Sequence, residues 1–374
     1  MSVDAAEPQF RPAPSNEPVV FPLSWLLQNA SASIQYRAIK EVAKLPGDPS
    51  GLFSVALASR PSLALAVAQR TDGTWNNTML TVPSAQPPSL QGVGTISAVR
   101  RLLESGWDRD TPPIHHARRI LFRLLAEDDD PNFLYELRVK GRMELEMVRR
   151  GRSILREAAA ACLARCGYEH DPRLRGAARR VIDRIDRYVR SPLMQKPWVR
   201  SGNRQVLAAE ASPPSIYALE MLAFMPTFRG ENITQMDRIY GYVSQVLPRQ
   251  EPTQLVGTAI IDQPHVVLGD WLPNRNATDS DVPMALYWLE LMARLSFLRR
   301  NENWLRLLDR FLDDRDRDAV WHPHKGMVGP KSPNPLVWHM FPLEPKAASE
   351  DRWTDVTFRL GLIARLSGRP IEFV

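Results

Sequence analysis

Cysteine is scarce in this sequence, since a chain of 374 residues contains only two. Two cysteines give no disulfide framework of the kind that holds small secreted domains together, and they are typical of a reducing compartment. Lysine is also scarce: it supplies seven of the 48 basic residues, so the other 41 are arginine. The formal net charge of +6 comes without any uninterrupted basic block. We therefore expect the arginines to lie on the polar faces of helices and do not expect a nucleic-acid-binding arm.

Long apolar runs are missing as well. No stretch approaches the roughly 18 residues that a membrane span needs. The N-terminal segment 1–22 is acidic and rich in proline, and it lacks the basic start and apolar stretch of a secretory signal. These features predict a cytoplasmic protein with a proline-rich N-terminal arm at residues 1–22 and one folded domain over residues 23–374.

An internal repeat is the clearest pattern that is present. Residues 102–123 align without a gap with residues 163–184. Cys162, Cys166 and His170 follow one another at spacings of four, which would place them on one face of a continuous helix and suggests a metal site. In the alignment, however, Cys166 and His170 meet a serine and an arginine, which a ligand set would not be expected to do. We interpret both cysteines as small buried residues.

Helices of one kind recur along the chain. Six segments are apolar, rich in small residues and bounded by capping residues, glycine or proline, at a spacing of about 60–70 residues. They cover residues 32–47, 94–106, 156–167, 214–226, 281–297 and 353–368. More polar, arginine-rich helices lie between them, for example at 114–127, 174–189 and 301–314. The pattern predicts an all-α fold of about twelve helices in two concentric layers, with the apolar set inside; an open α-solenoid stays as the alternative.

A short motif adds a family resemblance. Gln69, Gly73 and Trp75 form the pattern Q-x-x-x-G-x-W. This pattern resembles the repeat of squalene–hopene cyclases and their relatives, in which the Gln closes a helix end and the Trp ties outer helices together. Residues 316–321 and 194–199 resemble decayed copies. The resemblance implies a closed (α/α)6 toroid, as in terpenoid cyclases and the β subunits of protein prenyltransferases.

The resemblance also suggests a reaction. Class II cyclases protonate an alkene with an Asp of a D-x-D-D motif, and the closest match here is Asp279-Ser280-Asp281, which lacks the last Asp. Two neighbouring buried carboxyl groups can share a proton, so Asp279 or Asp281 would be the proton donor of an acid-initiated cyclase or isomerase. Helix capping by Asp281 is the alternative. Asp355, at the start of the last apolar helix, is a third candidate catalytic residue.

Aromatic residues are concentrated late in the chain, where seven of the ten tryptophans follow residue 190. Aromatic faces can stabilise a carbocation. We therefore expect the C-terminal half to line an apolar central cavity for a hydrophobic ligand such as an isoprenoid. The candidate ligand-binding residues are Tyr217, Glu220, Tyr287 and Trp288. The N-termini of the inner helices would form one mouth of this cavity, where backbone dipoles favour anions.

Metal chemistry has less support. The Asp, Cys and His set that binds zinc in protein prenyltransferases has no match at the starts of the inner helices, so prenyl transfer to protein is not expected and no cofactor is predicted. His322 and His324 could contribute to a metal site, as could the aspartates of the loop from Asp313 to Asp318. Both stay open as alternatives to solvated loops.

A function of another class is equally compatible with the sequence. The chain would then be a non-catalytic scaffold that docks a protein partner through its arginine-rich surface and its proline-rich arm. The incomplete D-x-D-D motif and the missing zinc set favour this alternative. Whether the chain is an enzyme is left open. Nucleic-acid binding, a third hypothesis, predicts a steep dependence on salt.

Overall fold

The computed structural model describes most of the chain. The described residues are 17–45, 50–57, 59–83, 92–126, 145–247, 251–256, 259–272, 281–323, 327, 330, 332, 334–343 and 351–374. Helices make up most of this structure, so the predominantly helical fold is confirmed. Among the helices within these residues, none combines the length and the apolar character that crossing a bilayer requires.

Six helical segments supply much of the buried core, although the N-terminal half of the longest one is only partly buried, and we name them the central helices. They are α2 (Ala32–Arg37) with the π-helical turn Ala38–Ala43 that continues it, α5 (Thr95–Glu104), α7 (Leu145–Arg165), α9 (Ile216–Ala223), α13 (Val282–Arg294) and α15 (Thr354–Leu366). Each coincides with one of the six small-residue segments, so those six helices are confirmed. α7 begins 11 residues earlier than the predicted 156, since it starts at Leu145. Every residue of α9 is buried, as expected for a helix with apolar side chains on all faces.

The remaining helices bury one face only, and we name them the peripheral helices. They are α1 (Leu23–Asn29), α3 (Ser50–Leu57), α4 (Arg60–Val67), α6 (Pro112–Leu125), α8 (Pro172–Val189), α10 (Pro226–Glu231), α11 (Ile233–Val243) and α14 (Glu302–Asp313). α6, α8 and α14 match the predicted arginine-rich helices. Asp171 caps α8 by accepting a hydrogen bond from the Arg173 amide, which satisfies a donor that the helix itself leaves unpaired.

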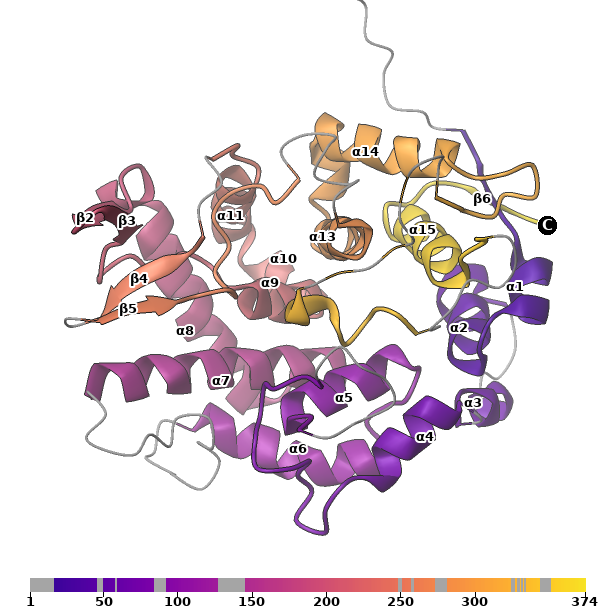
Figure 1. Cartoon of the computed structure of the whole chain (residues 1–374), viewed down its shortest axis with the longest axis horizontal. Coiled ribbons are helices and arrows are strands. Elements are labelled where there is room, and N and C mark those ends of the chain that lie inside the picture. Colours follow the sequence, from indigo (N-terminus) through magenta and orange to yellow (C-terminus); the bar gives the residue numbers. More distant parts are fainter. Residues whose placement is uncertain are drawn as a thin grey trace, which may run out of the picture.

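The central helices contact one another in series. α5 contacts α7, α7 contacts α9, α9 contacts α13, and α13 contacts α15. α15 also contacts α2 and its π-helical turn, and Arg37 of α2 forms an ion pair with Glu104 of α5. In Figure 1 the central helices lie around the middle of the molecule, with α4, α6 and α14 towards its rim. One hydrophobic cluster extends from Val19 through α5, α7, α9, α13 and α15 to Ala364, whereas most of the buried apolar residues of α2 and its π-helical turn belong to a second cluster with Phe21.

Two small sheets depart from the expected all-α fold. β1 (Val19–Phe21) pairs in parallel with β6 (Ile371–Phe373), and β2 (Trp198–Ser201), β3 (Arg204–Leu207), β4 (Thr253–Val256) and β5 (Ala259–Asp262) form a four-stranded sheet in that order. The expectation of a purely helical chain is therefore wrong. The strands are only three or four residues long, too short to show a clear alternation of apolar and polar residues.

β1 lies within the segment expected to be an N-terminal arm. Phe21 is 1% exposed, and its ring packs so closely on α15 that a Cβ at Gly361 would overlap it. The main chain of Phe21 also accepts a hydrogen bond from the amide of Val374. The described part of the segment, residues 17–22, therefore belongs to the folded body. Residues 1–16 lie outside the described residues.

Candidate functional site: a buried charge cluster

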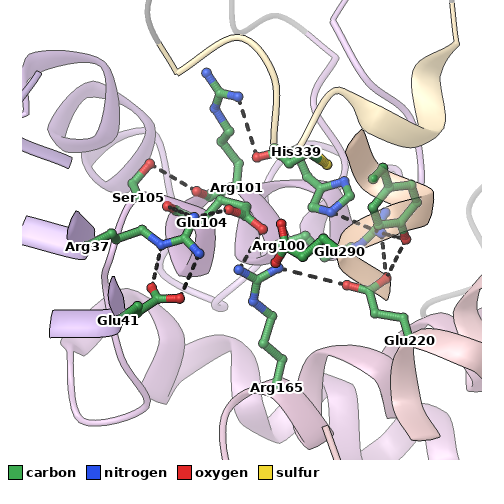
Figure 2. Close-up of polar contacts among 12 residues, drawn as sticks. Arg37, Glu41, Arg100, Arg101, Glu104, Ser105, Arg165, Glu220, Glu290 and His339 are labelled. Carbon is green, nitrogen blue, oxygen red and sulfur yellow. Dashed lines mark hydrogen bonds and ion pairs between the residues drawn. The ribbon is translucent and has the colours of Figure 1, made fainter. Parts of the chain in front are cut away.

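Charged side chains from all six central helices meet at the middle of the molecule, and Figure 2 shows most of them. We name them the central charge cluster: Arg37 and Glu41 on α2 and its π-helical turn, Arg100 and Glu104 on α5, Arg165 on α7, Glu220 on α9, Glu290 and Arg294 on α13, and Arg359 on α15. Three of these pairs are spaced i, i+4, which places both members on one face of a helix. Burying a charge without a partner costs roughly several kcal/mol, so each member of the cluster needs a partner of opposite sign.

Glu104 is the hub of the cluster. Its Oε1 lies 2.6 Å from a terminal nitrogen of Arg165, and its Oε2 lies 2.6 Å from one of Arg359. Arg37 donates to the same Oε2 atom. Burial alone would raise the pKa of Glu104, but the three guanidinium groups outweigh it and hold the pKa well below its usual value. Glu104 is therefore a carboxylate that binds three helices to α5.

A second set of contacts surrounds Arg100. A terminal nitrogen of Arg100 lies 2.6 Å from Oε2 of Glu220, and the hydroxyl of Tyr287 donates to the same oxygen at 3.2 Å. Burial and the neighbouring Glu220 charge raise the pKa of Tyr287 well above its ordinary value, which keeps the hydroxyl protonated as a donor. The Arg100 guanidinium also lies 5.3 Å from the ring centre of Tyr217, within reach of a cation–π interaction.

His339 enters this set from outside the central helices. Its Nδ1 lies 3.0 Å from the carbonyl oxygen of Leu336, so Nδ1 carries the proton, and its Nε2 accepts from Arg100 at 3.3 Å. Burial lowers the pKa of His339 well below its ordinary value, and the Arg100 charge lowers it further. The imidazole is therefore neutral at physiological pH.

Glu290 joins α13 to α15. Its Oε2 lies 2.7 Å from Arg359, and its Oε1 lies 2.9 Å from Arg294 on the next turn of the same helix. Burial would raise the pKa of Glu290, but these arginines lower it. At the edge of the cluster, Arg37 holds Glu41 through two hydrogen bonds. Against the opposing effect of burial, this pairing lowers the pKa of Glu41 to about 2.

The cavity at the centre is small, and both charged and apolar side chains line it. Its volume is about 10 Å³, which is close to the minimum for a single water molecule. It is lined by Glu104, Arg165, Glu220, Phe224, Tyr287, Glu290, Leu291 and Arg294. A general acid needs a pKa raised towards neutrality, whereas the three cluster carboxyls whose pKa changes all shift downwards. The downward shifts keep these carboxyl groups ionised and paired with arginine.

The structure brings together three of the four predicted ligand-binding residues. Tyr217, Glu220 and Tyr287 all surround Arg100. Trp288 belongs instead to an aromatic group between α13 and α14, where its ring centre lies 5.0 Å from that of Trp271 and 6.2 Å from that of Trp304. Adjacent residues on a helix point about 100° apart, so Tyr287 and Trp288 face different sides of α13.

The candidate catalytic aspartates lie at the starts of central helices. Asp281 caps α13, because its Oδ1 accepts from the Met284 amide at 3.0 Å and its Oδ2 accepts from the Ser332 hydroxyl at 2.8 Å. Burial raises its pKa. Asp355, in the first turn of α15, is fully buried and accepts from the Leu343 amide at 2.9 Å. Asp279 lies outside the described residues.

The motif residues Gln69, Gly73 and Trp75 lie between two peripheral helices. The Gln69 amide donates to the carbonyl of Gly73 at 3.0 Å and to that of Pro113, at the start of α6, at 2.8 Å. Trp75 is fully buried, and its indole nitrogen donates to the Leu65 carbonyl of α4 at 2.7 Å. Gly73 has φ +88, and a Cβ there would lie 3.0 Å from a backbone oxygen of α6, so glycine suits both its conformation and its surroundings.

The segment 316–321 repeats this arrangement with different residues. The backbone amide of Trp321 donates to the Thr357 hydroxyl at 3.0 Å, just as that of Trp75 donates to the Thr95 hydroxyl at 3.0 Å. Ala319, two residues before the Trp, takes the positive φ of +62 where the first copy has glycine. In the position of the Gln, Arg315 donates to the Val20 carbonyl at 2.6 Å. The segment 194–199 instead leads into strand β2.

The alternative metal sites are occupied by other contacts. The Oδ1 of Asp316 accepts from two amides of its own turn, and Arg352 forms ion pairs with Asp316 at 2.9 Å and Asp318 at 3.0 Å. His324 lies outside the described residues. Over the part of the chain that the structure describes, no group of three His, Cys, Asp or Glu side chains is arranged to hold a metal ion. Cys162 and Cys166 are buried and unbonded to each other.

Sequence reasoning missed most of the charge cluster. The prediction named Glu220 but no other member. A signal was present, because three charge pairs spaced i, i+4 interrupt segments that are otherwise apolar on all sides: Arg37 with Glu41, Arg100 with Glu104, and Glu290 with Arg294. Charges on the buried helices of a double layer must meet partners from other helices, so these pairs predict a common cluster.

Comparison with known proteins does not add to this description, since no family model, curated protein or solved structure matches the chain. Proposals about its function therefore rest on the geometry described above.

Proposed function

We propose that this chain is a closed (α/α)6 toroid that works as a binding scaffold for an acidic protein partner. Closure is supported by the series of contacts between the central helices, which returns from α15 to α2. It is also supported by the pairing of β1 with β6 and by the hydrogen bond from Arg315 to the Val20 carbonyl. Gln69 makes the equivalent bond to the next peripheral helix along the chain.

A basic surface on two peripheral helices carries the proposal. We name it the basic face, and its exposed arginines are Arg119 and Arg123 on α6 and Arg173, Arg179, Arg180 and Arg187 on α8. α6 and α8 contact each other. Within Pro112–Leu125 and Pro172–Val189, Asp183 is the only exposed acidic residue. The basic face therefore presents a strong excess of positive charge to the surroundings.

The chemistry of this surface suits carboxylates. Arg173 already binds Asp171 with two nitrogens, at 3.0 and 2.8 Å, which is the paired geometry that a guanidinium forms with a carboxylate. The same guanidinium lies 3.7 Å from the ring centre of Phe122. Arginine and aromatic residues are enriched at protein interfaces. We infer that aspartate and glutamate side chains of a partner bind to the basic face.

The centre of the molecule supports a scaffold more than an enzyme. A cavity of about 10 Å³, whose lining includes Phe224, Tyr287 and Leu291 beside glutamate and arginine side chains, is far too small to hold an isoprenoid. The hypothesis of a hydrophobic ligand and acid-initiated cyclisation stays a prediction. Mass spectrometry of an organic extract of the protein tests the ligand. Turnover of polyprenyl substrates by the double variant Asp279→Asn/Asp281→Asn tests the proton donor, and unchanged turnover would end that hypothesis.

The basic face can be tested directly with the full chain. We expect the protein to bind a polyglutamate peptide, and the double variant Arg119→Glu/Arg179→Glu to bind it about tenfold more weakly. The control is Arg306→Glu on α14, a side chain of similar charge whose ion pair with Glu302 is exposed; it should bind as the parent does. Fluorescence anisotropy measures the affinity of each of these proteins for the peptide.

Two results would contradict the proposal. Equal binding by the parent and the double variant would show that the basic face is not the site. Tighter binding to single-stranded DNA than to polyglutamate, with a steep loss of affinity as salt increases, would identify nucleic acid as the partner class instead. Deleting residues 1–16 and repeating the titration tests whether the N-terminal arm contributes.

A further inference from the structure

A ten-residue segment crosses the centre of the molecule above the charge cluster. We name it the plug, Asn334–Leu343. The plug contains a 3-10 turn, Pro335–Val337, and buries most of its side chains, with His339 only 2% exposed. Figure 2 shows His339 pointing from this segment towards the group around Arg100. The plug is thus inserted into the middle of the central helices rather than lying over them.

Three arginines hold the plug by hydrogen bonds, two of them to its backbone and one to a side chain. Arg101 donates to the carbonyl oxygen of Trp338 at 2.9 Å, to that of His339 at 3.4 Å, and to that of Pro342. Arg359 donates to the carbonyl oxygen of Met340 at 3.0 Å. Arg100 donates to the imidazole of His339. Five acceptor atoms of one short segment therefore meet three guanidinium groups.

Arg101 differs from the arginines of the charge cluster. Within the described residues, no carboxylate lies within ion-pair distance of its guanidinium, and neutral carbonyl oxygens take the place of an anion. Burial lowers the pKa of Arg101 to about 10, against the more distant attraction of Asp355 and Glu104. A guanidinium binds a charged oxygen roughly twice as strongly as a neutral one. Arg101 would therefore bind an anion more strongly than it binds these carbonyl oxygens.

We propose that the plug occupies a binding site for an oxyanion, a phosphate or carboxylate group that Arg100, Arg101 and Arg359 would hold in place of the plug carbonyls. The plug acts as an internal competitor. While the plug is bound to these arginines, the anion has no site. The apparent dissociation constant therefore equals the intrinsic constant divided by the fraction of molecules in which the plug is displaced. Weakening the plug must therefore tighten anion binding, and removing an arginine must weaken it.

Calorimetric titration of the full-length protein with inorganic phosphate, and separately with succinate, tests the proposal and distinguishes the two sources of the anion. His339→Ala removes the side chain that anchors the plug to Arg100, and we expect it to bind one of these anions at least about threefold more tightly than the parent. Arg101→Gln should lose about tenfold or more. The control Arg306→Gln, on the exposed surface of α14, should match the parent.

Hydrogen exchange of the plug amides shows whether the anion binds to the arginines that hold the plug. We expect saturating anion to speed exchange at residues 338–343, because the ligand and the plug compete for the same arginines. Binding without this change would place the anion elsewhere and overturn the proposal. Absence of binding by His339→Ala to both anions would also overturn it. If Arg101→Gln fails to fold, Arg101→Lys replaces it, since lysine keeps the charge but loses the fork that reaches two carbonyls.

Discussion

At Glu104 three guanidinium groups from three other helices share one buried carboxylate. Each of these arginines was desolvated during folding, and each relies on this charge for compensation. The distance between the partners along the sequence is large, since Arg359 lies 255 positions from Glu104. A single side chain therefore links segments that the chain itself keeps far apart.

Neutralising Glu104 should be costly. We expect Glu104→Gln to lower the free energy of unfolding by roughly 3–5 kcal/mol, because the variant leaves buried guanidinium groups without their counter-charge. Urea unfolding followed by circular dichroism measures the change. The matched control is Glu302→Gln, whose ion pair with Arg306 is exposed and should contribute less than about 1 kcal/mol. Equal losses in the two variants would contradict the role given to Glu104.

His339 should make stability depend on pH. Its pKa in the folded protein lies well below the ordinary 6.5, so the unfolded chain binds a proton first as the pH falls. Stability from the neutral imidazole is complete above about pH 6.5 and is lost below it. We expect His339→Asn to reduce the slope of unfolding free energy against pH between about pH 6.5 and 5. His265, whose pKa burial lowers to about 4, should keep part of the slope.

Urea unfolding at three pH values across this interval supplies the measurement. Identical slopes for the parent and His339→Asn would contradict the neutral, buried imidazole. Below about pH 4.5 a second loss should begin, because Glu41 is held ionised down to a pKa of about 2 and its contribution disappears as the pH falls through that range.

The helices were predicted from local patterns, whereas the strands were missed, although a local signal was present for one pair. Helical periodicity and capping residues located all six central helices to within a few residues, apart from the start of α7. β2 and β3 are four residues each, and the hairpin between them turns at Gly202 and Asn203, a Gly-Asn pair that is a recognised hairpin signal. The pairing of β1 with β6 joins opposite ends of the chain, and no local pattern can predict it.

Glutamine should partly replace Arg315, because Gln69 occupies the equivalent position in the first copy of the motif. We expect Arg315→Ala to lower the free energy of unfolding by about 1–2 kcal/mol, because the Val20 carbonyl loses a donor. Arg315→Gln should lose less, since Gln69 makes the equivalent bond with an amide. Thermal unfolding of the two variants measures the difference. An Arg315→Gln variant as unstable as Arg315→Ala would show that the two copies of the motif do not work alike.

At the scale of the whole molecule, the sequence indicated layered helices but not what fills them. The apolar central segments suggested a central cavity for a hydrophobic ligand. The observed centre contains paired charges such as Arg100 with Glu220, which lie 120 positions apart. Pairing at this distance depends on the packing of all six central helices, so it could not be read from either residue's neighbours. The place of His339 in this centre was missed for the same reason, since a loop carries it inwards.

Truncations distinguish the arm from the body. We expect deletion of residues 1–16 to leave the melting temperature nearly unchanged. Deletion of residues 1–22 also removes β1 and the buried ring of Phe21, and loss of a buried Phe side chain alone costs about 3–5 kcal/mol. Calorimetry of the two truncated chains against the parent gives the comparison. If both deletions leave stability unaltered, the β1–β6 pair does not hold the ends together.

Because β1 and β6 lie side by side, the chain could be joined there and opened elsewhere without changing the arrangement of its helices. The Val374 carbonyl accepts from the Ser24 amide at 3.0 Å, and a tether running back along β1 would have to cover only about 10 Å, the length of three extended residues. A circularly permuted gene that omits residues 1–16 could therefore start at the exposed Gly202–Asn203 turn and join Val374 to Glu17 without disturbing the β1–β6 pair. Reporter groups attached at Glu17 and Val374 of a chain without residues 1–16 would lie close enough together for energy transfer to report their separation.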